Sequence, residues 1–188
     1  TEVTAEAVRA EVPEVVVVAT GAKPRTLPIP GIERPEVVQA KEVLTGQAFV
    51  GPRVAVLGGG MVGAETAEYL ADRHREVTVI EMLDRIASDM APAPRAYLLR
   101  RLKQFEVEIV TGAKAEAITD HGVLVNIAGR RRMLGPFTNV VLAAGGEPIN
   151  DLAEQLQDQV QELYVGDACA VSCIADATAG AAQVALEI

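Results

Sequence analysis

Short runs of aliphatic residues recur along the chain and predict buried β-strands. The runs consist mainly of Val, Ile, Leu and Ala, which is typical of parallel strands that are covered on both faces. They occupy residues 15–19, 53–57, 77–81, 107–110 and 139–144. Their short length and their β-branched residues favour strands over buried helices.

Helical and alternating segments lie between these runs. Apolar residues follow helical periodicity in residues 96–105, and further helices are predicted at residues 64–71, 152–160 and 175–188. Apolar and polar residues alternate instead in residues 115–119, 123–127 and 131–134, which predicts an antiparallel meander. The predicted fold class is therefore α/β: a three-layer, Rossmann-like parallel sheet with a three-stranded antiparallel β meander on one face.

The remaining segments give weaker patterns. Residues 1–12 are polar with alternating valines, which suggests a strand and a turn. The proline-rich residues 27–31 predict an extended connector, because proline fits neither a helix interior nor a central strand. Residues 36–46 predict a short strand and a short helix that ends at Gly46, and residues 82–94 predict a loop.

A glycine-rich turn joins the strand at residues 53–57 to the helix at residues 64–71. The motif consists of Gly58, Gly59, Gly60, Met61, Val62 and Gly63. Gly58 allows a tight exit from the strand, Gly60 lets the backbone approach a pyrophosphate, and Gly63 lets the helix pack closely on the sheet. The helix would offer its free N–H groups to the phosphates, so these six residues are predicted to bind a dinucleotide. The alternative is a purely structural turn.

An acid ends the next predicted strand. Glu81 is suited to accept hydrogen bonds from the ribose hydroxyls of the cofactor and to repel a 2′-phosphate, which favours NADH over NADPH. Arg85 follows closely, and its positive charge would partly offset that preference. The alternative for Glu81 is a solvated strand end without a ligand.

Two further strand ends carry candidate residues. Gly145 and Gly146 follow the strand at residues 139–144, where two glycines permit a ligand to lie across the strand end as well as a tight turn. Gly166 and Asp167 precede the last helix, where a carboxylate can hold a hydroxyl or a phosphate-bearing chain beside a helix terminus.

The composition excludes several function classes. The chain has 188 residues with 26 acidic and 17 basic side chains, a formal net charge of −9 that argues against nucleic acid and anionic membranes as partners. No apolar run could span a bilayer and no signal pattern opens the chain, so a cytoplasmic location is expected. Cys169 and Cys173 are expected to be buried or semi-buried free thiols, and no metal site is predicted.

Four motifs in order along the chain carry a resemblance to a known family. They are residues 19–22 with Pro24, residues 58–65, Gly145 with Pro148, and residues 165–168. The chain resembles the flavoproteins that nest an NAD(P)H-binding domain inside an FAD-binding domain. Residues 81–90 and 96–103 look most like the C-terminal part of NADH:flavin oxidoreductases of the 2,4-dienoyl-CoA reductase and enoate reductase type, which are similar to old yellow enzyme.

The resemblance implies that the chain is part of a larger enzyme. It implies an NADH domain at residues 51–146 between two FAD-domain segments, residues 1–50 and 147–188, with an FMN barrel, an iron-sulfur cluster and the first FAD motif supplied by a missing N-terminal part. NADH would reduce FAD, which feeds a substrate flavin, and no side chain of this chain is expected to be catalytic. A homo-oligomer is possible.

Two residues acquire roles from the resemblance. Glu65 matches the family residue near the nicotinamide, although an acid in the first turn of a helix also compensates the helix dipole. Asp167 matches the residue that binds FAD, but residues 171–173 depart from the family's usual proline and basic residue. An alternative function is a structural or ADP-binding domain, as in the amine dehydrogenases that the chain also resembles. A fragment of a stand-alone disulfide reductase or NADH oxidase fits the meander and residues 81–90 less well.

Overall fold

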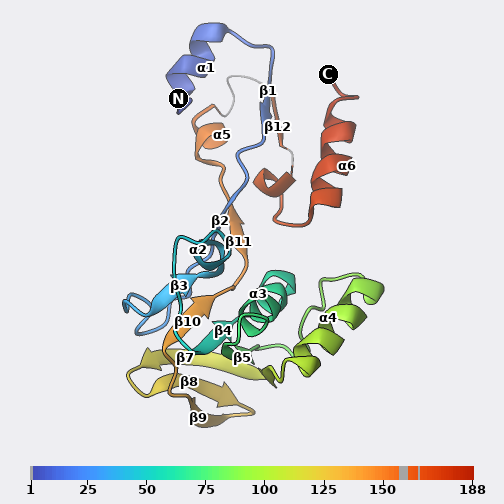
Figure 1. Ribbon diagram of the computed structural model, residues 1–188. Helices are drawn as coiled ribbons and strands as arrows, with labels where there is room; N and C mark the ends of the chain where they lie inside the picture. Colours follow the sequence, from blue (N-terminus) through green and yellow to red (C-terminus); the bar gives the residue numbers. More distant parts are fainter. Residues whose placement is uncertain (1, 157–160, 165) are drawn as a thin grey trace. The chain divides into compact units, whose positions relative to one another are not determined.

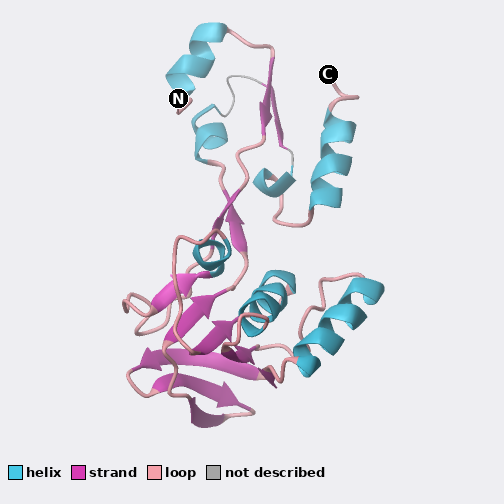
Figure 2. Ribbon diagram, in the orientation of Figure 1, coloured by secondary structure: helices cyan, strands magenta, loops and turns pink. Residues whose placement is uncertain are grey.

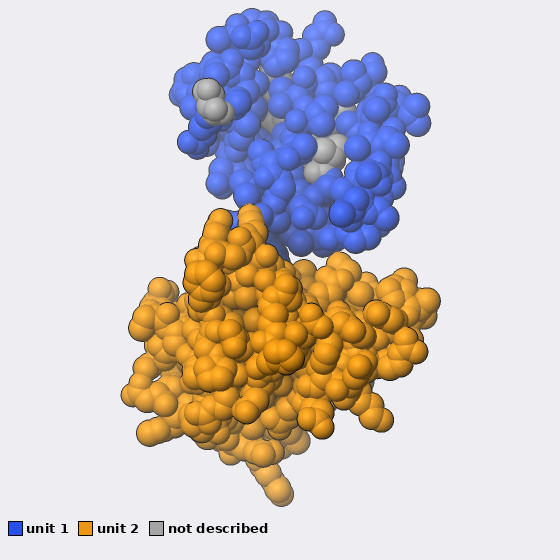
Figure 3. Space-filling model, viewed as in Figure 1, with its two compact units in different colours: residues 1–23, 146–188 blue, residues 24–145 orange. Residues whose placement is uncertain are grey.

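The computed structural model describes residues 2–156, 161–164 and 166–188. The chain forms two compact units (Figure 3). One unit consists of residues 24–145, and the other combines residues 1–23 with residues 146–188. Because the second unit is built from both ends of the chain, the first is an insertion within it.

A parallel five-stranded sheet is the centre of the unit at residues 24–145. Its strands lie in the order β3-β10-β4-β5-β6. Their bounds are β3 (Val37–Gln39), β4 (Arg53–Leu57), β5 (Glu76–Ile80), β6 (Glu108–Val110) and β10 (Asn139–Leu142). Leu57 lies level with Ile80 on one side and with Leu142 on the other, so three strands end side by side at one edge.

Helices cover one face of this sheet and the meander covers the other (Figure 1). The helices are α2 (Ala40–Leu44), α3 (Met61–Ala71) and α4 (Pro92–Gln104), and the meander strands are β7 (Ala113–Thr119), β8 (Gly122–Ile127) and β9 (Arg130–Leu134). Side chains alternate along β4, so Val54 and Val56 pack in the helical core while Ala55 and Leu57 pack in the meander core. The predicted three-layer α/β fold is therefore confirmed.

The connector before β4 belongs to the same compact unit. Leu27 and Ile29 pack against the meander core, and the amide of Ile118 donates to the carbonyl of Pro30 at 2.8 Å. Strand β3 then pairs with β10 at the edge of the sheet. Residues 24–50, which the sequence groups with an FAD segment, thus pack in the unit that carries the glycine-rich turn.

The second unit is smaller and is built on two pairs of strands (Figure 2). Strand β1 pairs in parallel with β12, and β2 pairs with β11. Its elements are α1 (Ala5–Glu11), β1 (Val15–Val18), β2 (Ala22–Pro24), β11 (Gly146–Pro148), α5 (Asp151–Leu156), β12 (Gln161–Tyr164), the 3-10 helix η1 (Gly166–Ala168) and α6 (Ile174–Val184). Val18, Ala153 and Ala168 form its small buried core, whereas α6 buries none of its side chains.

The prediction of a strand near the start of the chain was wrong. Residues 5–11 form helix α1, because the Thr4 hydroxyl caps the helix by accepting from the amide of Ala7 at 3.3 Å. Helix α4 begins at Pro92, earlier than predicted, since proline is tolerated in the first turn of a helix. Helix α6 ends at Val184, four residues before the predicted end. Helix α5 covers the first part of the helix predicted at residues 152–160, and the remaining residues of that prediction, 157–160, lie outside the described part of the chain.

Candidate dinucleotide-binding site

The glycine-rich turn leaves β4 at the carboxyl edge of the parallel sheet. The Gly58 backbone has a φ of +103°, a conformation that side chains disfavour, and its amide donates to the carbonyl of Ile80 at 3.0 Å. A Cβ atom on Gly58 would lie 2.3 Å from the carbonyl oxygen of Ala143, and one on Gly63 would lie 1.9 Å from that of Gly58. Both positions therefore require glycine, as the motif predicts.

Helix α3 starts directly after this turn. Gly60 is its N-cap and provides no side-chain cap, so the first amides of the helix depend on other acceptors. The amide of Met61 donates to both carboxylate oxygens of Asp89, at 2.9 Å each. Sequence reasoning missed Asp89, because an acid in a predicted loop gives no local sign that it will fold back onto a helix terminus.

Glu81 lies beneath the turn and supports it. Its side chain is only 6% exposed. One carboxylate oxygen accepts from the amide of Gly59, and the other accepts from the amide of Leu83 at 2.7 Å. The alternative of a solvated strand end is therefore wrong, because the carboxylate is buried and fixes the turn to the strand that follows. A carboxylate has about four acceptor positions, so these two bonds leave capacity for a further donor.

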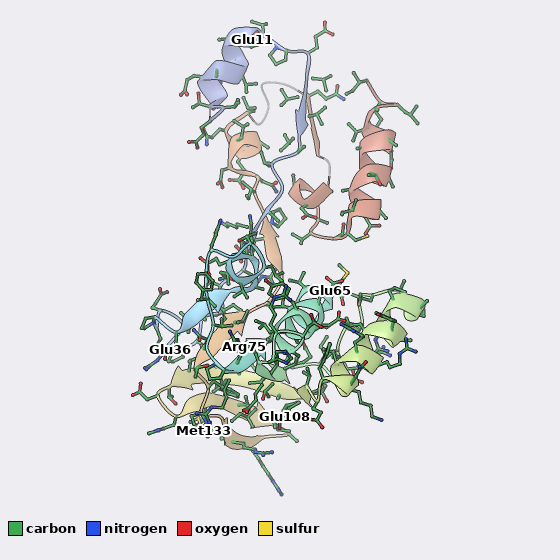
Figure 4. The ribbon with its side chains drawn as sticks, viewed as in Figure 1. Glu11, Glu36, Glu65, Arg75, Glu108 and Met133 are labelled. Carbon is green, nitrogen blue, oxygen red and sulfur yellow. The ribbon has the colours of Figure 1, made fainter. Side chains whose placement is uncertain are left out.

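Glu65 lies one turn into α3 and is exposed (Figure 4). Since the helix begins at Met61, Glu65 falls in the second turn, and no acid occupies the first turn. The interpretation of Glu65 as a first-turn acid is therefore wrong. Although the residue is exposed, its neighbours partly desolvate the carboxyl, and this desolvation, followed by the negative charges of Glu68 and Asp89, raises the pKa of Glu65 above its ordinary value. Arg85 is exposed in the loop after β5.

The other predicted residues lie elsewhere: Gly145 directly before β11 and Gly146 at its start, and Gly166 and Asp167 in the 3-10 helix η1. Gly145 has a φ of +87°, and its carbonyl accepts from the amide of Arg25 at 3.0 Å. Gly146, Gly166 and Asp167 belong to the other compact unit. Within that unit, Asp167 accepts from the amide of Ser172 at 3.0 Å, which closes the loop before α6. The structure thus brings together the glycine motif, Glu65 and Glu81, whereas Gly146, Gly166 and Asp167 form part of a separate unit.

Several other features carry no assigned chemistry. Cys169 and Cys173 are free but exposed, so the expectation that they are buried or semi-buried was wrong. The thiol of Cys173 donates to the carboxylate of Asp176. Among the described residues, no three His, Cys, Asp or Glu side chains are grouped as a metal site would require, and no helix has the length and apolarity to cross a bilayer. A cavity of about 290 Å³ lies at the opposite, amino edge of the sheet, beside Arg53 and Glu108.

A parallel sheet with this turn, and with a meander on one face, defines a dinucleotide-binding domain of the flavoprotein type. Residues 3–172 match the family described as "Pyridine nucleotide-disulphide oxidoreductase", and the chain belongs to this family. Members of the family are oxidoreductases that bind FAD and NAD(H).

Three similar proteins illustrate the relationship. The chain is 40% identical to the bilirubin reductase of Mediterraneibacter gnavus, over 87% of this chain and 25% of that protein. It is 37% identical to the NADH oxidase of Thermoanaerobacter brockii, over 98% of this chain and 29% of that protein. A solved structure of 2-naphthoyl-CoA reductase with 2-naphthoyl-CoA aligns with a TM-score of 0.89 and 29% identity, over 100% of this chain and 29% of that one. The chain thus spans between a quarter and a third of the length of these proteins.

Proposed function

We propose that this chain binds NADH as one part of a larger flavin-dependent oxidoreductase. The observation that carries the proposal is the turn between β4 and α3. Gly58 and Gly63 pack so closely that no side chain fits, and the amino end of α3 faces the edge where β4, β5 and β10 end. Helix amides and a glycine backbone without side chains are the groups that a pyrophosphate needs.

Glu81 supports a preference for NADH over NADPH. Its buried carboxylate already accepts from two amides, and a ribose hydroxyl would be a third donor of the same kind. A 2′-phosphate has no hydrogen to donate at neutral pH and would meet a negative charge instead. Arg85 lies four residues further along, where its exposed guanidinium would reduce this penalty.

The wider role of the chain is also part of the proposal. Bound NADH would supply a hydride for FAD, and the electrons would then pass to a substrate flavin in an enzyme of the dienoyl-CoA or enoate reductase type. The smaller unit, with Gly146, Gly166 and Asp167, would contribute to FAD binding. Support comes from the relatives named as reductases of bilirubin and 2-naphthoyl-CoA, which are much longer than this chain.

The test is a calorimetric titration of the chain with NADH, NADPH and ADP. We expect NADH to bind more tightly than NADPH, and Glu81→Gln to narrow that difference, because the variant removes the charge while its one amide oxygen still accepts from either the Gly59 or the Leu83 amide. The lost repulsion is worth roughly 1 kcal/mol, or about fivefold in the ratio of dissociation constants. Glu106→Gln is the control, since it removes the same charge from an exposed loop after α4.

Two results would contradict the proposal. An unchanged NADH-to-NADPH ratio in Glu81→Gln would remove Glu81 from the ribose site. Equal affinities for ADP and NADH would mean that the nicotinamide half contributes nothing, as in the alternative of a structural or ADP-binding domain.

A further inference from the structure

We propose that Asp89 is an internal competitor of the dinucleotide at the amino end of helix α3. The inference rests on the proposed function, because it concerns the same pyrophosphate position. It assigns a role to a residue that the glycine motif does not include and that lies 28 residues beyond Met61 in the chain.

The contact that carries the inference is specific. Both carboxylate oxygens of Asp89 accept from the amide of Met61, the first residue of α3, at 2.9 Å. One of these oxygens also lies 3.2 Å from the position that a Cβ atom on Gly60 would take. Asp89 therefore places its negative charge over the glycine backbone and the helix terminus, where a pyrophosphate would be held.

Hydrogen bonds and packing hold the loop that carries Asp89 against the glycine-rich turn. The amide of Ala87 donates to the carbonyl of Gly59 at 2.6 Å, and the side chain of Ile86 is buried. The guanidinium of Arg95 then donates to the carbonyl of Ile86 at 3.1 Å and 3.0 Å. Asp89 itself is exposed. The Met61 amide would therefore be freed by rotation of the exposed Asp89 side chain, while the loop backbone stays in place.

Two effects of opposite sign follow from this arrangement. In the empty protein, Asp89 satisfies an amide that Gly60 cannot cap and compensates the helix dipole, so it stabilises the fold. When a dinucleotide binds, Asp89 must leave the amide, and its charge remains close to the pyrophosphate. The fraction of molecules with Asp89 rotated away then limits the apparent affinity. A merely structural cap would produce only the first effect.

The experiment compares the wild type with Asp89→Asn and Asp84→Asn by calorimetry. Asp84→Asn is the matched control, because this substitution removes the same charge from an exposed position in the same loop. The ligands are NADH, ADP and adenosine, of which adenosine has no phosphate. Thermal unfolding of each unliganded protein is measured in parallel and shows whether the variants are folded.

We expect Asp89→Asn to bind NADH and ADP about threefold to tenfold more tightly than the wild type. Its affinity for adenosine should be unchanged, and its melting temperature without ligand should be lower. Asp84→Asn should differ from the wild type by less than about twofold, because an exposed charge that does not touch the helix terminus is largely screened.

Other outcomes overturn the inference in distinguishable ways. If the wild type binds NADH and Asp89→Asn binds it equally or more weakly, Asp89 does not compete with the cofactor. If Asp84→Asn gains as much affinity for NADH, the effect is one of general charge. If adenosine gains as much affinity as ADP, the effect does not involve the phosphates. If neither the wild type nor any variant binds NADH or ADP, the proposed function fails together with this inference.

Discussion

Three carboxylates surround the amino end of α3, and each is in a different environment. Glu81 is buried and accepts from two amides, Asp89 is exposed and accepts from the first amide of the helix, and Glu65 is exposed one turn later. The site is therefore negatively charged before any ligand arrives. An anionic cofactor would bind through backbone amides in spite of this field rather than through positive side chains.

The raised pKa of Glu65 gives stability a pH dependence. A folded-state pKa above the ordinary value of 4.5 means that the protonated carboxyl favours folding. This contribution is fully present below the unfolded-state pKa and is lost as the pH rises through the folded-state pKa. We expect Glu65→Gln to raise the melting temperature slightly at pH 7 relative to the wild type, and to have no such effect below pH 4.5.

Melting curves between acidic and neutral pH would measure this difference. Glu14→Gln, at an exposed loop position, is the control. An effect of Glu65→Gln that is the same at every pH would contradict the explanation, because it would reflect side-chain packing rather than charge.

Among the elements, α3 determines the geometry of the site because it packs tightly against the turn that leaves the sheet. Ala64, Ala67 and Thr66 are fully buried on its inner face, and the hydroxyl of Thr66 donates to the carbonyl of Val62 at 2.6 Å. Small side chains and a satisfied hydroxyl allow the helix to pack on the strands without a gap. The position of the helix terminus thus follows from residues that never touch a ligand.

Gly63→Ala tests this close packing. The added Cβ would lie 1.9 Å from the carbonyl oxygen of Gly58, so α3 must move away from the turn. We expect a loss of about 1–3 kcal/mol of stability, as for an overpacked core, and at least tenfold weaker NADH binding. Urea unfolding and calorimetry would measure the two losses.

Gly180→Ala is the matched control for that variant. Gly180 lies within α6, and a Cβ atom there would have nothing within 4 Å. The same substitution should therefore stabilise the protein by roughly 0.5–1 kcal/mol, because alanine is the better helix former. If both variants behaved alike, crowding at Gly58 would not be the cause.

The sequence predicts those elements whose patterns are local. The aliphatic runs of β4, β5 and β10 and the alternation of β7 to β9 are each readable within a few residues, so the three-layer fold could be predicted. Helix α1 was missed because its cap at Thr4 outweighs an irregular apolar pattern. The role of Asp89 could not be predicted, since it depends on the path of the loop in three dimensions.

At the scale of the whole molecule, the glycine motif, Glu81 and Asp89 all lie in the unit at residues 24–145. The ends of this unit also meet, because the amide of Arg25 donates to the carbonyl of Gly145. A shortened chain of residues 24–145 should therefore fold cooperatively and bind NADH with an affinity within about twofold of that of the full chain. Circular dichroism on heating and calorimetry would measure both properties.

The opposite result would also be informative. If the shortened chain unfolded in a broad transition or lost NADH binding, residues 1–23 or 146–188 would have to support the site. The proposed division of labour between the two units would then be incorrect.

The pairing of β1 with β12 has a consequence for the order of events during synthesis. Val15 pairs with Gln161, so β1 must wait until the whole unit at residues 24–145 and the residues after it have left the ribosome before its partner exists. The unit at residues 24–145 can fold during that wait, since domains form as units while the chain grows. Once it has folded, it brings the flanking segments together and shortens the effective loop that β1 and β12 must close, which lowers the entropic barrier to their pairing.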